Sequence, residues 1–185
     1  LYTEYVYLDM KRSFNGGGSF TTITTGINLD QSTERIAFYA PYDVSKSTPA
    51  VMYAGTYKIW KSTDRGSNWA STSADLTGGT GVTSAITIAP SNANHVYVGT
   101  SDGRIWSTTD GGTTWNPVGT HPLLDTETMQ INYRFVTDFA VHPSDPNVSF
   151  VSFSGYNQPH LFKTTDHGVL WTNISGNLPD IPVNA

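Results

Sequence analysis

The chain has 185 residues, a formal net charge of −5 at pH 7 and an apolar fraction of 37%, which is enough to build a core. Its ten Lys and Arg are not clustered, which argues against a nucleic-acid or anionic-membrane surface. No apolar run approaches the roughly 20 residues of a transmembrane helix. The absence of cysteine excludes a disulfide scaffold, a thiolate metal site and a cysteine nucleophile. We therefore expect no nucleic-acid partner and no membrane insertion.

One phrase recurs along the chain. Its first and weakest copy is SFNGGGSF at 13–20, and the later copies are STDRGSNW at 62–69, STTDGGTTW at 107–115 and TTDHGVLW at 164–171. The closing aromatic residues are separated by 49, 46 and 56 residues, from subtraction of their numbers, and they are Phe20, Trp69, Trp115 and Trp171. Such self-similarity is the signature of a repeat architecture.

Short alternating segments surround each copy of the phrase. Those that end in proline are predicted to be the innermost strands: 35–41, 84–90 and 137–143. The second strands are predicted at 51–56, 95–100 and 147–155, the third at 58–62, 104–108 and 160–164, and the fourth after each phrase, as at 114–119 and 170–176. Four short strands in about 45–55 residues, with no amphipathic helix between them, predict a blade of a β-propeller.

The predicted fold is therefore all-β, a β-propeller segment of about four four-stranded blades in a single domain, 1–185. The approximate blades are 1–34, incomplete because it lacks an inner strand, then 35–81, 82–135 and 136–180, with 181–185 starting the next. Because the chain begins with Leu1 and ends in PDIPVNA, we expect a piece of a larger six- to eight-bladed ring. The remaining blades of the parent chain or a second copy would then cover its free faces.

The phrase resembles the Asp-box, or bacterial neuraminidase repeat, which in its known families forms the turn between the third and fourth strands of a propeller blade. The matching positions are Asn15, Gly17, Phe20, Asp64, Gly66, Trp69, Asp110, Gly112, Trp115, Asp166, Gly168 and Trp171. The first copy departs from the pattern, with Asn in place of Asp and Phe in place of Trp. The whole chain is similar to secreted bacterial Asp-box repeat proteins and to propellers of the xyloglucanase and sialidase type.

A structural role explains these residue types. An Asp in a tight turn accepts hydrogen bonds from N–H groups two and three residues on, Gly supplies a positive φ, and the aromatic ring packs under the loop. Asn15 keeps the acceptor oxygen. Calcium binding is the alternative, but the several acidic positions and terminal Glu of an EF-hand loop are missing. We expect no metal and no cofactor.

Binding residues are expected on the rim opposite the Asp-boxes, where loops join the second strand to the third and one blade to the next. Within the long loop 121–135, Tyr133 and Arg134 are candidate ligand contacts, and Tyr156, Asn157 and His160 are candidates in the loop 155–160. The alternative is that 121–135 merely covers a neighbouring blade.

Candidate catalytic carboxylates are Asp125, Glu127 and Asp138, because many glycosidases use two carboxyl groups about 5–10 Å apart. The resemblance to sialidases implies three arginines, a Tyr nucleophile and an Arg-Ile-Pro motif, whereas Arg35-Ile36 is followed here by Ala37. The resemblance to xyloglucanases implies catalytic aspartates on two different propellers, of which a chain this short would hold a part.

We therefore expect a non-catalytic extracellular propeller module that presents one face to a glycan or a protein. The alternative is a fragment of a glycoside hydrolase of the xyloglucanase or sialidase type, and a third possibility is a pure assembly part. Secretion or display at the cell surface is inferred from the richness in Ser, Thr, Asn, Gly and Tyr, and from glycosylation patterns at Asn147 and Asn173.

Overall fold

The computed structural model describes residues 1–117 and 134–184, and in this part of the chain the regular secondary structure is entirely β-strand. The first sheet holds β1 (Tyr2–Glu4), β2 (Met10–Arg12) and β3 (Thr21–Thr22). The second holds β4 (Tyr42–Val44), β5 (Met52–Gly55), β6 (Ile59–Ser62) and β7 (Ala70–Ser71). The third holds β8 (Thr83–Ile88), β9 (Val96–Thr100), β10 (Ile105–Thr108) and β11 (Asn116–Pro117). The fourth holds β12 (Val136–Val141), β13 (Ser149–Phe153), β14 (Leu161–Thr164) and β15 (Thr172–Asn173). Over the same residues no helix is long and apolar enough to cross a bilayer.

Each sheet is an antiparallel meander in which the strands pair in chain order. Successive side chains therefore point to opposite faces of a sheet, which accounts for the period-two pattern of the sequence. The third and fourth sheets share an irregularity, since the register shifts between Thr83 and Ala85 in β8 and between Val136 and Asp138 in β12. The matching shifts identify β8 and β12 as equivalent inner strands.

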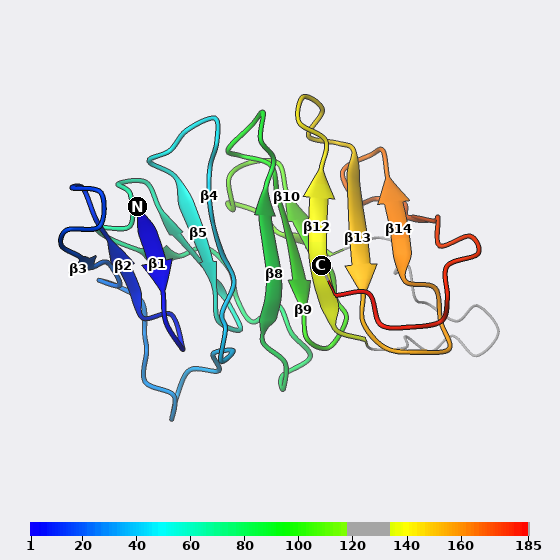
Figure 1. Cartoon of the computed structure of the whole chain (residues 1–185), viewed down its shortest axis with the longest axis horizontal. Helices are drawn as coiled ribbons and strands as arrows, with labels where there is room; N and C mark the ends of the chain where they lie inside the picture. The colour runs from blue at the N-terminus through cyan, green and yellow to red at the C-terminus, as the bar shows by residue number, and fades with distance from the viewer. Residues whose placement is uncertain (118–133, 185) are drawn as a thin grey trace.

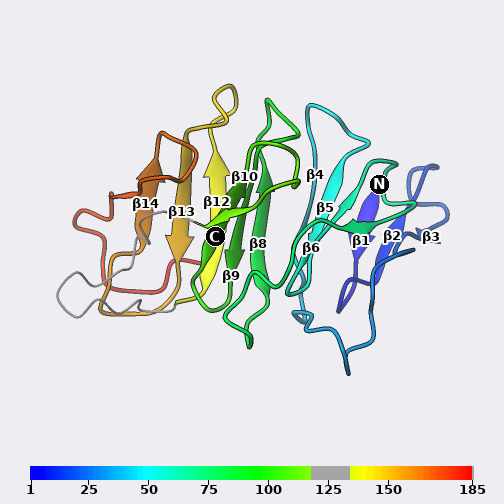
Figure 2. The same ribbon diagram turned by 180° about the vertical axis from the view of Figure 1, so that it is seen from behind.

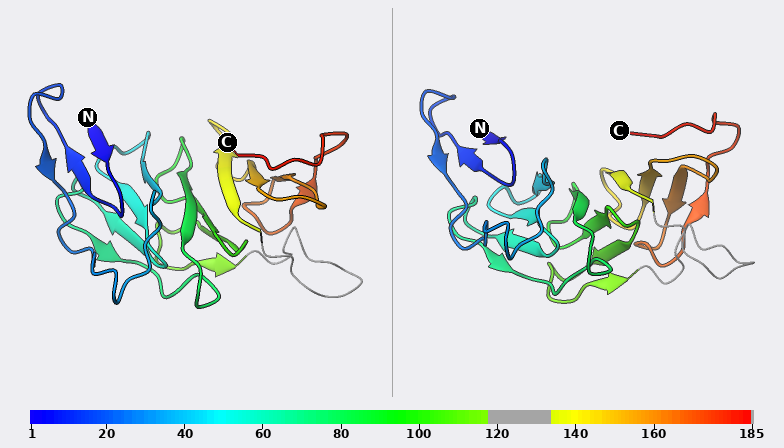
Figure 3. Two further views of the ribbon diagram at one scale, coloured as in Figure 1. Left: turned by 60° about the horizontal axis from the view of Figure 1, so that its bottom comes forward. Right: turned by 90° about the horizontal axis from the view of Figure 1, so that it is seen from below.

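The four sheets stand face to face and follow one another along an open arc, with the first and fourth sheets at its two ends (Figures 1 and 3). The same order is seen from behind (Figure 2). The apolar core consists of three clusters, one between each pair of neighbouring sheets. Burial of both faces of a sheet explains why the strands of the second and third sheets are apolar on both sides.

Glycine in the second strand lets the next sheet approach. A Cβ on Gly99 of β9 would lie 2.3 Å from a methyl group of Val136, and one on Gly55 of β5 would lie 2.6 Å from Thr83. No side chain fits at such distances. The inner strand of each following sheet thus packs directly on the backbone of the sheet before it.

The prediction of an all-β propeller is confirmed, and the first sheet has three strands, in line with the predicted incomplete first blade. One correction concerns the second sheet. Residues 35–41, predicted to be the inner strand, form no strand, and the inner strand is β4 at Tyr42–Val44, directly after that segment. Phe38, which lies within the predicted strand, is exposed. The reason is the position of the proline relative to the strand. Pro41 precedes its inner strand, and its carbonyl oxygen accepts the Gly55 N–H. Pro90 and Pro143 instead follow their inner strands. Proline lacks a ladder donor and is tolerated at either end of a strand.

Candidate functional site

The four Asp-box turns join the last two strands of each sheet, which are β2 and β3 in the first sheet and the third and fourth strands in the others, and they share one hydrogen-bond pattern. In the second sheet the Ser62 hydroxyl donates to Asp64 Oδ1 at 2.8 Å and accepts the Gly66 N–H at 2.8 Å. Asp64 Oδ1 in turn accepts the Asn68 N–H at 2.9 Å. The hydroxyl and the carboxylate together close the turn, and the φ of +84° at Gly66 is the left-handed conformation that favours glycine.

The other copies repeat this pattern. The aspartate or asparagine oxygen accepts the N–H of Ser19, Thr114 or Leu170, at 2.9, 2.9 and 3.0 Å. These donors lie four residues beyond the acceptor, rather than two or three as expected. Asn15 also accepts the Ser13 hydroxyl and donates through Nδ2 to Ser19 Oγ, so the amide fills the place of the carboxylate.

The box carboxylates titrate as stabilised anions. Hydrogen bonds, the largest from the Asn68 side chain, lower the pKa of Asp64 to about 2, and those from Thr114 lower the pKa of Asp110 to about 2. The pKa of Asp166 is also lowered, mainly by the Leu170 N–H. A general acid needs a pKa nearer the working pH. Among the described residues no group of three or more potential metal ligands gathers, at the boxes or elsewhere.

The second, third and fourth boxes also contact the sheet before them. Trp69 Nε1 donates to the carbonyl of Ile23 at 2.7 Å, in the segment after β3, and Trp69 and Trp171 are buried. Phe20, which closes the first box, was expected to pack under its loop and is instead exposed. The physical reason is that the closing aromatic packs against the preceding sheet, and no described sheet precedes the first.

Three of the predicted site residues lie outside the described residues: the ligand candidate Tyr133 and the catalytic candidates Asp125 and Glu127. Three of the others come together around Asp180, which the sequence analysis did not single out. His160 Nε2 lies 3.2 Å from Asp180 Oδ1, and Asp180 accepts the Asn157 N–H at 2.7 and 2.8 Å. Arg134 Nη2 lies 3.3 Å from His160 Nδ1. Tyr156 is exposed at the tip of the same loop.

Both ring nitrogens of His160 have polar partners. Nδ1 lies 3.3 Å from Arg134 Nη2, which donates, and 3.4 Å from the carbonyl oxygen of Phe153, which accepts, while Nε2 faces the carboxylate of Asp180. Arg134 packs over Gly155, and burial lowers its pKa. Its Nε and Nη1 are buried and have no hydrogen-bond partner among the described residues. The cluster holds a cation, a buried imidazole and a carboxylate in one row.

A polar hollow of about 300 Å³ opens beside this row. It is formed by the loop after β13, by the end of β15 and by the segment after β15. Its lining residues are Asn157, Gln158, Pro159, His160, Asn173, Ser175, Gly176, Leu178 and Asp180. Amide, hydroxyl and carboxylate groups therefore converge on one cavity at the rim opposite the Asp-boxes. Such a concave site with a few converging polar groups suits a small polar ligand.

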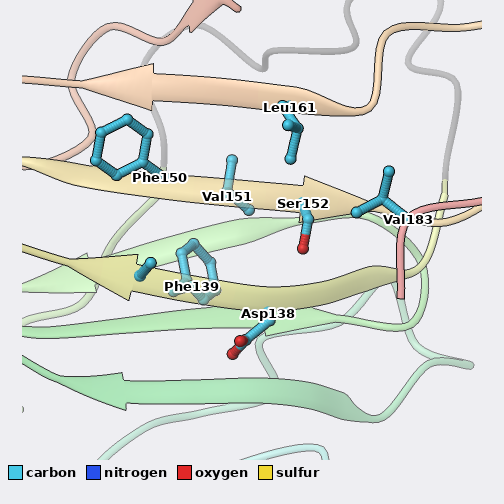
Figure 4. Close-up of a pocket in the computed structure, with 8 residues that line it drawn as sticks. Asp138, Phe139, Phe150, Val151, Ser152, Leu161 and Val183 are labelled. Carbon is cyan, nitrogen blue, oxygen red and sulfur yellow. The ribbon is translucent and has the colours of Figure 1, made fainter. Parts of the chain in front are cut away.

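Asp138 lies apart from this cluster, on β12, where it borders an apolar hollow of about 170 Å³ (Figure 4). A third hollow, of about 350 Å³, lies along the inner strands and is bordered by Asp43 and Lys46. Asp43 accepts the N–H groups of Ile88 and Val44 at 2.8 and 2.7 Å. Burial raises its pKa, and the charge of Asp138 adds to the effect. Asp43 was not predicted as a site residue, because the inner strand was expected at 35–41 and Asp43 lies beyond that segment.

Antiparallel four-stranded sheets in face-to-face array, each closed by an Asp-box turn, define a propeller of the Asp-box type. The chain belongs to the Sortilin-Vps10 family, described as sortilin or neurotensin receptor 3, whose model matches residues 57–181.

Several glycoside hydrolases are similar to it. Xyloglucanase Xgh74A of Acetivibrio thermocellus is 26% identical over 136 residues, which cover 64% of this chain and 16% of the relative. The chain thus spans about a sixth of that relative. The GH74 xyloglucanase from Xanthomonas campestris has a TM-score of 0.69 at 15% identity, over 95% of this chain and 28% of the other. The GH74 enzyme of Niastella koreensis has a TM-score of 0.68 at 17% identity, over 97% and 28%.

A propeller with a different name is also similar. YCF48 from Cyanidioschyzon merolae has a TM-score of 0.51 at 16% identity, over 71% of this chain and 38% of the other. At these identities the solved structures establish the shared fold.

Proposed function

We propose that the chain is a non-catalytic, extracellular propeller module that binds a glycan in the hollow beside Arg134, His160 and Asp180. The observation that carries this proposal is the row of hydrogen-bonded groups along a polar cavity of about 300 Å³. Sugar hydroxyls both donate and accept, and the lining offers amides, hydroxyls and a carboxylate. The exposed ring of Tyr156 adds an apolar platform for a sugar face.

The kinship with xyloglucanases suggests which glycan to try first. Xyloglucan oligosaccharides are the first probe, because a relative that matches 64% of the chain carries the name xyloglucanase. Sialosides are the second, because the boxes resemble those of sialidases. Binding would be measured by calorimetry on the full 185-residue chain.

Two variants test the site. Asp180→Asn keeps the shape of the side chain and removes its charge, and Tyr156→Ala removes the exposed ring; each is expected to weaken binding about tenfold or more. The matched controls lie beside the first sheet, at the half-buried Asp9 and the exposed Tyr5: Asp9→Asn and Tyr5→Ala. Unchanged affinity in the two site variants, with unchanged melting temperature, would place the ligand elsewhere. If the chain bound a protein partner and none of the glycans, the proposal of a glycan-binding module would be contradicted.

A glycoside hydrolase fragment is the second candidate, favoured by one observation. The pKa of Asp43 is raised, mainly by burial and also by the charge of Asp138, and a raised pKa is what a general acid needs. Hydrolysis of xyloglucan that disappears in Asp43→Asn or Asp138→Asn would support this function. Asp125→Asn and Glu127→Gln extend the test to the candidates outside the described residues.

A further inference from the structure

The three contacts between neighbouring sheets repeat one hydrogen bond. The third residue of the strand that precedes each box, in β2, β6 and β10, faces the next sheet and donates to the carbonyl oxygen of the residue that follows the next box aspartate. Arg12 donates to Arg65 O, Lys61 to Gly111 O at 2.7 Å, and Ser107 to His167 O at 3.1 Å. The equivalent residue of the fourth sheet is Lys163, the third residue of β14.

Apolar side chains on the same face also repeat. Tyr53 and Tyr97, each the second residue of a second strand, are fully buried by the next sheet, whereas their equivalent Phe150 in β13 is 37% exposed. Ile23, which follows β3, is 2% exposed, whereas Ile174, which follows β15, is 42% exposed. The fourth sheet therefore carries the side chains of a covered face without a described sheet to cover them.

The C-terminal segment lies where a further inner strand would begin. Ser84 Oγ of β8 donates to Val136 O of the next inner strand at 2.7 Å, and the equivalent Thr137 Oγ1 of β12 donates to Val183 O at 2.9 Å. Val183 therefore stands against β12 as Val136 stands against β8. It borders the apolar hollow of the fourth sheet together with Phe150 and Leu161 (Figure 4).

The first sheet presents the complementary surface. Its closing aromatic, Phe20, is 45% exposed, whereas the equivalent Trp69 and Trp171 are each 6% exposed because they pack on a preceding sheet. The residue after Asn15, equivalent to Arg65 and His167, is Gly16. In the described chain β1 has no inner strand beside it. Both surfaces lie at the ends of the open arc (Figure 3).

We propose that these two surfaces meet between two copies of the chain. The first sheet of one copy packs on the fourth sheet of the other, Lys163 donates to the partner's Gly16 carbonyl, and Phe20 is buried against Ile174 and Phe150. The segment around Val183 then lies beside the partner's β1, in the place of the missing inner strand. The occupant is argued from complementarity, because the contact repeats the three interfaces within the chain. When both ends engage, two copies close a ring of eight sheets with two-fold symmetry.

The test is the mass of the particle in solution. Sedimentation equilibrium of the wild-type chain is expected to give a dimer, and Phe20→Arg and Ile174→Arg are each expected to halve the mass. An equal mixture of the two variants should again give a dimer, because one intact interface remains between an unmodified first sheet and an unmodified fourth sheet. Asn116→Arg, on the exposed strand β11 of the third sheet, is the matched control and should stay dimeric.

Disulfide cross-linking is a second test of the contact between the two copies, and it does not depend on the charged variants. The chain has no cysteine, so Phe20→Cys and Ile174→Cys introduce one thiol each. Mixed together under oxidation they should form a disulfide-linked pair, and each alone should not. A wild-type chain that is monomeric at its highest soluble concentration would overturn the proposal. So would a dimer unaffected by Phe20→Arg, because it would be held by a different surface.

Discussion

At the scale of the residue, the box hydroxyl is as important as the box aspartate. Ser62, Thr108 and Thr164 are buried, and each accepts the N–H of the box glycine while donating to the carboxylate. A buried N–H that loses its acceptor is costly, whereas the carboxylate lies in solvent. The turn is thus closed by a pair of side chains, of which the hydroxyl is the buried member.

Replacement of that hydroxyl is expected to destabilise the fold. Thr108→Val keeps the shape of the side chain and leaves the Gly112 N–H unpaired, so the free energy of unfolding should fall by about 1–3 kcal/mol. Urea unfolding followed by tryptophan fluorescence measures it. The control is Thr21→Val, on the exposed strand β3, which should be close to neutral. Equal effects of the two substitutions would contradict the role assigned to the hydroxyl.

The lowered pKa of Asp110 predicts a pH dependence. Its folded-state pKa of about 2 lies below the usual 3.8, so the unfolded state takes up the proton first as pH falls. The stability contributed by Asp110 is therefore complete above about pH 4 and is lost as pH falls toward 2. Asp110→Asn, which copies the natural Asn15, should show a shallower loss of stability over that window. Identical slopes for the variant and the wild type would refute the assignment.

At the scale of the element, each fourth strand and its box depend on the neighbouring sheet. The indole of Trp69 reaches the carbonyl of Ile23 across the interface, and the ring of Trp171 packs in the cluster between the third and fourth sheets. The turn is formed by hydrogen bonds within the box, but its aromatic residue stabilises the fold only where it packs against a preceding sheet. The stability that the closing aromatic residue contributes therefore depends more on its position in the array of sheets than on its residue type.

Two truncations of equivalent residues measure this dependence. Trp69→Ala should lower the free energy of unfolding by about 3–5 kcal/mol, because it empties a buried site and removes the Nε1 hydrogen bond. Phe20→Ala should lower it by less than about 1 kcal/mol in the monomeric chain, because the ring is already exposed. Chemical denaturation at low protein concentration compares them. A large loss for Phe20→Ala under these conditions would mean that the ring is covered within one chain.

At the scale of the whole molecule, the described sheets form a linear array in which each apolar cluster joins two sheets that are neighbours along the chain. In such an array stability is close to a sum of unit and nearest-neighbour terms, so units at the ends are weaker. The second and third sheets are covered on both faces by other sheets of the chain, and the first and fourth on one. The weakest parts of a single chain are therefore its two end sheets.

Hydrogen exchange tests this order. In the Phe20→Arg variant, which is expected to be monomeric, amides of β9 and β10 should exchange most slowly and those of β2 and β13 faster. In the dimeric wild type the end sheets should gain protection, because each then acquires a second neighbour. Uniform protection across the four sheets of the variant would contradict the linear array.

The sequence by itself determined the repeat, the strand type and the box turns, because these depend on local chemistry: alternation, turn residues and an acceptor oxygen in each box. Local reasoning was wrong at 35–41, where the inner strand was expected to end at Pro41 and instead begins after it.

Only the tertiary structure decided which side chains meet. Arg134, His160 and Asp180 come from three separate segments, and no spacing rule joins them. The exposure of Phe20 and the covered-face pattern of Phe150 and Ile174 likewise depend on which sheet stands beside them. The burial of a side chain depends on which residues surround it in space. The alternation of apolar and polar residues in the sequence shows which face of a sheet is apolar but not which element covers that face.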